Sequence, residues 1–546
     1  MNMKRIIAMS VAVTMAAGIM SGCAKNDGNA ETTSAETTVG TSAEAAAAAA
    51  EPIKAIFGEI RSEYNTSLDM TERPLTASEV PADFSAKYEA EDGKTEGKAA
   101  VESSFDGFSG TGYVDHFEGS TDKLTFTVDA PADGSYDLNF MCASNGGHKV
   151  NFVAADGTQI GEITTDNEEF GFNSLKNIYL EKGQHEITLS VSWGWIKVDY
   201  LEMTASSAVS EDTYSVSPVL SNPDADENAQ RLMKFMTDIY GNYTLSGQFA
   251  DKGRTSSELA RIQETTGKQP AVLGLDLIEY TPSRVANGSS GDAVEQAYDW
   301  YVNAGGIVSM CWHWNAPEKY LVNSESNPWY RGFYKEATTI NLDDIMNGRD
   351  DEGYDLLMQD IDAIAVQLKR LCDSGVPVLW RPLHEASGGW FWWGNCEPES
   401  YKKLWNILYD RLTNEYGLTN LIWVWNGQSR DWYPGDDTVD IIGEDIYPGT
   451  QVYTSQSGKF AEAAETSGTA KLVALTENGC VPDPDLLFRD NARWLLWSTW
   501  SGEFIVNNFG QLSETYTEAD MLKKAYGSEY VLTLDELPDL RNYPIQ

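Results

Sequence analysis

The stretch Val376–Gly394 reads VPVLWRPLHEASGGWFWWG, and its pattern indicates how the second half of the chain folds. Its first residues, Val376–Trp380, form a short apolar run after a glycine, which is typical of a strand buried on both faces. Arg381, His384 and Glu385 stand where this strand should end, and a tryptophan-rich loop follows them. The stretch therefore predicts a buried strand that delivers chemically active side chains. The alternative is a core strand that ends in ordinary polar residues.

Seven further runs share this pattern of a short apolar segment that ends in polar or aromatic residues. They are 244–248, 271–275, 306–312, 421–425, 441–446, 472–476 and 494–498. Helical patterns separate the runs, over 227–240, 294–304, 354–374, 400–415 and 518–526. Eight strand–helix units predict an α/β domain over residues 225–546, a closed (β/α)8 TIM barrel.

The residues that follow these runs test the barrel prediction, because such barrels carry their working side chains at the carboxyl ends of the strands. The ends carry Asp276, His313, Glu385, Asn426, Tyr447, Glu477 and Trp500. We therefore expect these side chains to share one site.

Glu385 and Glu477 end the fourth and seventh runs. Two carboxylates on one pocket are what cleavage of a glycosidic bond requires, one as proton donor and the other as nucleophile or as base for water. A separation of about 5–5.5 Å predicts retention, and a wider gap predicts inversion. A barrel-mouth salt bridge is the alternative for either glutamate taken alone.

Neighbouring side chains should push the two pKa values apart. We expect Arg381 and Tyr447 to hold Glu477 ionised, and apolar walls from Trp390 and Trp393 to keep Glu385 protonated.

Four further residues are expected to contact a sugar or to orient the glutamates. His313 and His384 can hydrogen-bond hydroxyls, although a lone histidine is more often structural. Trp390 and Trp500 should form flat walls of the sugar subsites.

The charge balance restricts the partners. The chain has 39 basic and 83 acidic residues, a net charge of −44, which excludes attraction to nucleic acid or to anionic lipid. A neutral polysaccharide fits this balance. The six cysteines show neither a zinc pattern nor a disulfide framework, so we interpret the internal ones as buried thiols, with one bridged pair as the alternative.

The amino terminus has the features of a secretory signal over residues 1–22: Lys4 and Arg5, a short apolar run and small residues. Met20–Cys23 resembles a bacterial lipobox, which implies lipid on Cys23 and a protein anchored outside the cell to the bacterial membrane. An ordinary cleaved signal is the alternative. Residues 23–84 are assigned to a disordered tether because their first half is nearly devoid of large apolar residues.

Residues 85–205 show short alternating segments between turn residues, which predict an all-β sandwich, and 206–224 reads as a linker. Trp193 and Trp195 lie on the same side of an extended segment and can stack on a sugar, although closing the core is the more natural role for Trp195.

Three short motifs in this region resemble a family 35 carbohydrate-binding module, a jelly roll. They are Tyr88-Glu89-Ala90-Glu91, Gly110-Thr111-Gly112-Tyr113-Val114 and Val198-Asp199-Tyr200-Leu201. The resemblance implies a structural calcium ion held by acidic groups such as Glu89, Glu91 and Asp199.

The larger domain resembles glycoside hydrolase family 26, which consists mostly of retaining β-1,4-mannanases. The motifs are Trp380–Glu385, Gly389–Gly394, Trp312–Asn315, Asp445–Tyr447 and Leu475–Gly479. The resemblance implies that Glu385 is the acid/base and Glu477 the nucleophile. It also implies that Arg381, His313, His384, Trp390, Tyr447 and Trp500 surround the cleavage subsite. Ala386-Ser387 departs from the Met-Asn pair frequent in the family.

The expected activity is therefore an endo-acting mannanase that needs no cofactor and works as a monomer. Two alternatives belong to the same family, a mixed-linkage β-glucanase and a β-1,3-xylanase. A third is a non-catalytic glycan-binding lipoprotein.

Overall fold

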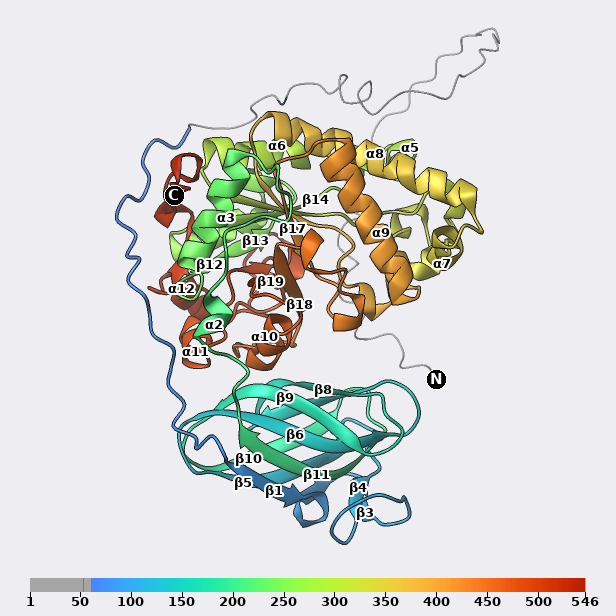
Figure 1. The fold of residues 1–546 in the computed structure, drawn as a ribbon, viewed down its shortest axis with the longest axis vertical. Coiled ribbons are helices and arrows are strands. Elements are labelled where there is room, and N and C mark those ends of the chain that lie inside the picture. Colours follow the sequence, from blue (N-terminus) through green and yellow to red (C-terminus); the bar gives the residue numbers. More distant parts are fainter. Residues whose placement is uncertain (1–52, 54–59, 546) are drawn as a thin grey trace.

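The computed structural model describes residues 53 and 60–545, which form an antiparallel β-sandwich and a closed parallel barrel (Figure 1). The predicted signal peptide, Cys23 and the first part of the predicted tether lie outside the described residues. Within the described part of the chain, every helix is too short or too polar to span a bilayer. Both parts of the predicted fold class, the sandwich and the eight-stranded barrel, are confirmed.

The sandwich consists of two antiparallel sheets. In the first, the order is β3-β4-β11-β6-β9, with β1 also paired to β11; in the second, it is β2-β5-β10-β7-β8. The strands of the first sheet are β1 (Ser85–Glu89), β3 (Ala100–Glu102), β4 (Tyr113–Asp115), β6 (Gly134–Ser144), β9 (Gly171–Leu180) and β11 (Ile196–Ala205). Those of the second are β2 (Lys94–Glu96), β5 (Lys123–Ala130), β7 (Lys149–Ala155), β8 (Thr158–Thr165) and β10 (Gly183–Val191).

Buried and less buried residues alternate along the strands, and this alternation explains why the two sheets pack face to face. In β6, Leu138, Phe140 and Cys142 point inward and are fully buried, while the residues between them are less covered. In β10, Ile187 and Leu189 face them from the other sheet. A strand with this period of two buries one face and leaves the other to solvent, so two such sheets form one core.

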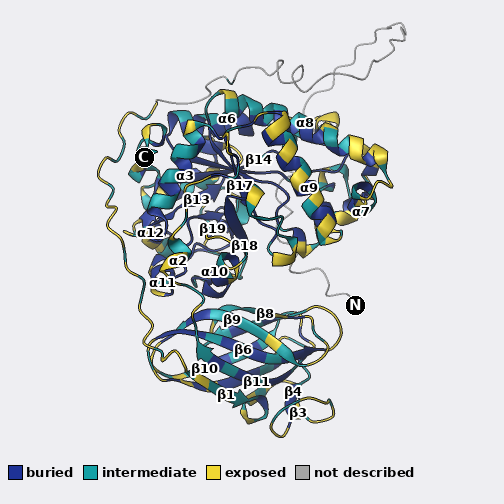
Figure 2. Ribbon diagram, viewed as in Figure 1, coloured by how far each residue is buried: buried dark blue, intermediate teal, exposed yellow. Residues whose placement is uncertain are grey.

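The barrel closes through eight parallel strands in chain order. They are β13 (Gly247–Phe249), β14 (Val272–Asp276), β15 (Ile307–Cys311), β16 (Val378–Arg381), β17 (Leu421–Trp425), β18 (Ile441–Ile446), β19 (Leu472–Asn478) and β20 (Trp497–Thr499). The first predicted run is divided: β12 (Thr244–Leu245) pairs with β21 (Val531–Leu532) outside the barrel, and β13 completes the ring. The barrel strands are almost wholly buried (Figure 2).

Helices cover the barrel, and the longest helix shows the apolar face through which such a helix packs. In α8 (Asp351–Asp373), the buried residues Leu357, Ile361, Ile364 and Leu368 recur at intervals of three and four, so they form one apolar stripe. The other helices of eight or more residues are α3 (Glu227–Ile239), α4 (Ser257–Thr266), α9 (Pro398–Asp410), α10 (Ser457–Ala464) and α12 (Ala519–Tyr526). Shorter helices are α2 (Glu211–Tyr214), α5 (Pro282–Ala286), α6 (Ala293–Tyr298), α7 (Leu342–Met346) and α11 (Pro484–Arg489).

Residues 60–84 differ from the predicted tether. This segment runs along the flank of the barrel to the module (Figure 1, blue). The buried Arg493 guanidinium donates to the carbonyl oxygens of Arg73 and Pro74, at 2.7 Å each, and the backbone N–H of Thr76 donates to Asn491 at 2.9 Å. The tether prediction rests on the composition of the first half of residues 23–84 and extends to this segment, whereas hydrogen bonds made by its backbone to the barrel hold the segment in place.

The module docks on the barrel beside α10 and α11. The Asn177 amide donates to the carbonyl oxygen of Asp490 at 2.9 Å, and Lys176 pairs with Glu465 at 2.7 Å. The guanidinium of Arg489 lies 4.8 Å from the ring centre of Tyr179. Strand β9 therefore belongs to both the module's sheet and the interface between the two parts.

Candidate active site

The two predicted glutamates lie at the carboxyl ends of β16 and β19. Glu477 is in β19 itself and is 4% exposed. Glu385 follows β16 and takes a left-handed backbone conformation, with φ of +53°, while its N–H donates to the carbonyl oxygen of Asn426 at 2.7 Å. A non-glycine residue in this conformation is strained, and the bond to the β17 end helps to hold it there.

The carboxylates of Glu385, Glu477 and Asp445 meet. One oxygen of each lies within 4.8 Å of the others. Such a distance belongs with the narrow spacing of retaining glycosidases, about 5–5.5 Å, rather than with the spacing of about 6.5–9.5 Å that leaves room for an inverting water. The barrel thus brings together two groups that are far apart in the sequence.

Arg381 contacts Glu477, as the sequence predicts. Its fully buried guanidinium donates through Nη2 to Oε1 of Glu477 and through Nη1 to Asp445 at 2.7 Å and to Asn426 at 2.9 Å. A buried guanidinium keeps its charge, so Arg381 places a fixed positive charge against one oxygen of Glu477.

Tyr447 contacts the other oxygen of Glu477. Its hydroxyl donates to Oε2 at 2.5 Å. Burial, followed by the charges of Glu477 and Glu385, raises the pKa of Tyr447 well above its usual range, so the hydroxyl remains a donor. Both oxygens of Glu477 therefore accept a hydrogen bond, which holds the carboxylate in one orientation.

Burial, followed by the charges of Asp445 and Glu477, raises the pKa of Glu385 well above its usual range. Trp390 also contacts Glu385 directly: its indole N–H donates to Oε2 of Glu385 at 2.8 Å, which lowers the pKa. Trp393 is buried and donates to the His384 carbonyl oxygen. Desolvation and like charge outweigh the indole bond and keep Glu385 protonated.

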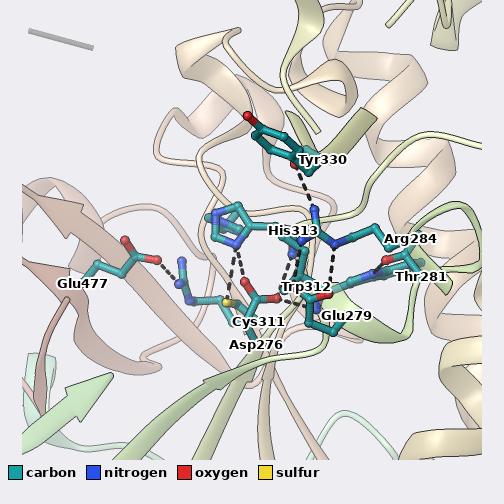
Figure 3. A network of polar contacts seen from close by, with 12 residues as sticks. Asp276, Glu279, Thr281, Arg284, Cys311, Trp312, His313, Tyr330 and Glu477 are labelled. Atoms are coloured by element: carbon teal, nitrogen blue, oxygen red, sulfur yellow. Dashed lines mark hydrogen bonds and ion pairs between the residues drawn. The ribbon is translucent and has the colours of Figure 1, made fainter. Parts of the chain in front are cut away.

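His313 and His384 form a pair, with their Nε2 atoms 3.2 Å apart (Figure 3 labels His313). The Asp276 carboxylate accepts from Nδ1 of His313 at 2.6 Å, which orients the imidazole so that its Nε2 faces Nε2 of His384. Burial, followed by the charge of Arg381, lowers the pKa of His384 well below its usual range and keeps that ring neutral. The sequence did not assign this orienting role to Asp276, although it ends a predicted strand.

Trp500 closes one side of the site. Its ring packs on Phe249, with centroids 4.5 Å apart, and lies 5.8 Å from the ring of His313. Phe249, at the end of β13, was missed because a buried phenylalanine at a strand end carries no chemical signal. Thus all six residues predicted to bind substrate gather around the two glutamates or around the histidine pair.

Asp445 and Asn426 are the other residues that sequence reasoning left without a role. Asp445 pairs with Glu477 across β18 and β19, next to an irregularity in the register of the two strands. Burial raises the pKa of Asp445 even though Arg381 contacts it. The Asp445-Ile446-Tyr447 motif is the signal that could have revealed it, since two polar residues flank Ile446 at a strand end.

The cysteines in the described part of the chain, Cys142, Cys311, Cys372, Cys396 and Cys480, are free thiols. Cys311 lies at the end of β15, opposite Asp276 of β14 and Arg381 of β16 in the register of the sheet. Its Sγ atom is 4.0 Å from Nδ1 of His313.

In the module, Trp193 and Trp195 are about equally exposed, at 51% and 50%. Trp195 therefore does not close the core, and both it and Gly194 take a left-handed backbone conformation, with φ of +60° and +58°.

The three residues predicted to bind calcium lie around the loop that contains Ser109 and Thr111. Ser109 Oγ donates to Glu89 at 2.9 Å and to Asp199 at 3.2 Å, and the Thr111 hydroxyl donates to Glu91 at 3.1 Å. One buried oxygen of Glu91 has no hydrogen-bond partner. Oxygen ligands of this kind suit a hard cation, and the ammonium group of Lys87 lies 2.8 Å from Glu89.

Two family models match the chain. Residues 221–536 match glycosyl hydrolase family 26, and residues 86–206 match carbohydrate binding module (family 35). Among curated proteins, a mannan endo-1,4-beta-mannosidase of Thermothelomyces thermophilus is 40% identical over 458 residues, which are 84% of this chain and 91% of that protein. Mannan endo-1,4-beta-mannosidase B of Piromyces sp is 38% identical over 83% of this chain and 77% of that protein.

Two solved structures are similar to this chain over different parts of it. The GH26-CBM35 beta-(1,4)-mannanase of Podospora anserina has a TM-score of 0.58 and 40% identity, over 84% of this chain and all of that one. A beta-mannanase from a symbiotic protist of the termite Reticulitermes speratus, complexed with gluco-manno-oligosaccharide, has a TM-score of 0.51 and 32% identity, over 59% of this chain and 98% of that one.

Proposed function

The chain belongs to glycosyl hydrolase family 26, and we propose that it hydrolyses internal β-1,4-mannosidic bonds of mannan, galactomannan or glucomannan. The observation that supports this most is the meeting of Glu385 and Glu477 within 4.8 Å at the carboxyl ends of two barrel strands. The mannanases to which the chain is similar supply the substrate class.

The reaction is a double displacement with retention at the anomeric carbon. Glu477 attacks that carbon while Glu385 gives its proton to the leaving glycosidic oxygen, so the C–O bond breaks and a glycosyl ester of Glu477 forms. Glu385, now a carboxylate, takes a proton from water, whose oxygen attacks the same carbon and displaces Glu477. Arg381 and Tyr447 support this division, because both donate to Glu477 and neither donates to Glu385.

The sugar at the cleavage subsite contacts His313, His384, Trp390, Tyr447 and Trp500. The histidine pair can exchange hydrogen bonds with ring hydroxyls. Trp390 is 37% exposed and presents a flat apolar face, which suits the carbon-rich face of a pyranose. No cofactor takes part in the two displacements.

The module assists by binding the polysaccharide. Trp193 and Trp195 form its sugar platform, and calcium stabilises the loop at Ser109–Thr111 through Glu89, Glu91 and Asp199. The anchor is a further part of the proposal: Cys23 receives lipid and holds the enzyme, a monomer, outside the cell on a bacterial membrane. This part depends on the sequence motif alone.

A product profile tests the activity. Mannan, mixed-linkage β-glucan and β-1,3-xylan are digested separately, and the products are separated by size. We expect mannan to release a ladder of short oligosaccharides at early times, and the first-formed products to carry the β configuration by proton NMR. Preferential cleavage of glucan or xylan would show that mannan is not the substrate. First-formed products of the α configuration would show that the mechanism is not retaining. If none of the three polysaccharides is cleaved, the chain is a glycan-binding protein and not an enzyme acting on them.

A further inference from the structure

A second polar group lies beside the glutamates and takes no part in the double displacement. Asp276 Oδ2, Cys311 Sγ and His313 Nδ1 lie within 4.8 Å of one another. Figure 3 shows the three side chains converging from two neighbouring strand ends, with dashed lines from the imidazole to the carboxylate and toward the sulfur. Neither the acid/base step nor the nucleophilic step uses the thiol.

The backbone holds these three groups in place. Asp276 and Cys311 are partners in the register of β14 and β15, and His313 is two residues beyond Cys311. Residues two apart on an extended segment point to the same side, so Cys311 and His313 face Asp276 together. Trp312, between them, points away and donates to the Thr281 hydroxyl at 2.9 Å. The site is therefore built on rigid strands rather than on a loop.

We propose that Asp276, Cys311 and His313 form an inhibitory binding site for a thiophilic divalent cation such as Zn²⁺ or Cd²⁺. A thiolate, an imidazole and a carboxylate are a common ligand set for Zn²⁺, with three protein ligands and a fourth position open to water. The distances fit after small movements. Nδ1 of His313 is 2.6 Å from Asp276 and 4.0 Å from the sulfur of Cys311, and ligands around a tetrahedral ion of this size stand about 3–4 Å apart.

The cluster of three carboxylates in the active site does not compete for such an ion. Glu385, Asp445 and Glu477 also have oxygens within 4.8 Å of one another, but Arg381 donates to two of them. A fixed guanidinium already neutralises that group, and its oxygen-only ligands favour hard cations over soft ones. The sulfur of Cys311 therefore determines where the ion binds and which class of ion binds there.

Inhibition follows from the position of His313. The ion binds Nδ1 of His313 in place of the hydrogen bond that this atom now makes to Asp276. Binding turns the imidazole, whose Nε2 faces His384. Both histidines then lose the orientation in which they meet the sugar. Occupancy of the site and loss of activity should rise together.

Cadmium is the probe, because a Cd²⁺–thiolate bond absorbs in the near ultraviolet and reports binding without any substrate. Metal-free full-length protein is titrated with CdCl₂ while absorbance and mannan hydrolysis are followed. A single equivalent should produce the band and the inhibition, a chelator should reverse both, and CaCl₂ or MgCl₂ should produce neither. Inhibition is expressed against each protein's own metal-free rate.

Cys311→Ser tests the assignment, and Cys480→Ser is the matched control. Cys480 is also a buried thiol just beyond a barrel strand, but its Sγ donates to the carbonyl oxygen of Gly449 and Cys480 belongs to neither of the two clusters of potential metal ligands among the described residues. We expect Cys311→Ser to lose the band and to need about tenfold more Cd²⁺, or more, for half inhibition, and Cys480→Ser to behave as the parent. A parent-like titration of Cys311→Ser would overturn the proposal.

A further variant covers the case in which Cys311→Ser does not fold. It retains Cys311 and replaces Cys23, Cys142, Cys372, Cys396 and Cys480 by serine. The band must persist in this protein, and its absence would also overturn the proposal. Because the band needs no substrate, this result is independent of whether the enzyme cleaves mannan.

Discussion

The indole N–H of Trp390 donates to Oε2 of Glu385 at 2.8 Å, and this bond opposes the environment of that carboxyl. Burial, followed by the charges of Asp445 and Glu477, raises the pKa of Glu385, whereas the indole bond lowers it. The net pKa is well above the usual range, so Glu385 holds a proton at a pH where an exposed glutamate is ionised. The Trp390 bond thus limits the rise of the Glu385 pKa.

Trp390→Phe should move the basic limb of the pH profile of kcat/KM to higher pH. Activity needs protonated Glu385, so it is present below the pKa of this group and is lost as the pH rises through it. Removing the indole donor destabilises only the carboxylate form and raises that pKa further. Trp193→Phe in the module is the control and should leave the limb in place. A basic limb that stays or moves to lower pH would contradict the prediction.

Glu385→Ala and Glu477→Ala should differ in their response to the leaving group. On mannan, the loss of acid catalysis costs Glu385→Ala about 10²–10⁴-fold in kcat. An aryl mannoside with a strongly acidic phenol needs no proton, so formation of the glycosyl-enzyme should recover in this variant but not in Glu477→Ala, which lacks the nucleophile. The exposed Glu399 serves as control, and Glu399→Ala should keep full activity. Equal losses for the two variants on both substrates would refute the assigned roles.

Arg381→Met should destabilise the barrel by about 3–5 kcal/mol, because Asp445 and Glu477 lose their buried partner. The denaturant midpoint, read from tryptophan fluorescence, measures the change. Arg349→Met breaks a pair with Asp344 on the surface, where both side chains are largely exposed, and should cost less than about 1 kcal/mol. Similar losses in the two variants would show that the buried pair adds nothing beyond a surface ion pair.

Tyr447→Phe should lower kcat/KM by about 10–100-fold, since a hydrogen bond to a charged group contributes roughly 1.5–3 kcal/mol. The expected change is in activity and not in fold, because the ring remains. Tyr453→Phe removes a hydroxyl that is 3.4 Å from Glu518 on the surface and is the matched control. Unchanged kinetics in Tyr447→Phe would mean that Arg381 alone orients Glu477.

Trp193→Ala combined with Trp195→Ala should weaken binding to insoluble mannan by about thirtyfold, at roughly 1 kcal/mol for each stacked ring. Hydrolysis of a short soluble mannooligosaccharide should not change, because that substrate needs only the barrel. Phe172→Ala removes another exposed ring of the module and should leave binding intact. Pull-down with insoluble mannan measures the first effect, and a reducing-sugar assay measures the second. If the double variant binds like the parent, the platform lies elsewhere.

The eight strand runs could be predicted because strands buried on both faces are short and apolar and because polar residues follow them. The limits of individual elements were harder to predict. The first run is shared between β12 and β13, and helix α6 continues as a wider helical turn over Asp299–Asn303. Such details depend on which neighbour a residue pairs with, and that neighbour is far away in the sequence.

The order of residues 60–84 shows the same limit. Their composition predicts a tether, since they have little apolar surface to bury. The structure holds them through backbone carbonyl oxygens that accept from Arg493 and through Asn491. The backbone is the same in every sequence, so composition cannot reveal contacts of this kind.

The sequence by itself determined the kinds of side chain at the strand ends, and with them the class of chemistry: two acids, a guanidinium, two imidazoles and flat aromatic rings. Only the tertiary structure decided which of them touch. It made Trp390 a hydrogen-bond donor to Glu385, placed Asp276 next to His313, and brought Asp445 into contact with Arg381. The physical reason is that strand order and register determine which side chains become neighbours, and the pKa of a carboxyl depends on those neighbours and on the solvent they exclude.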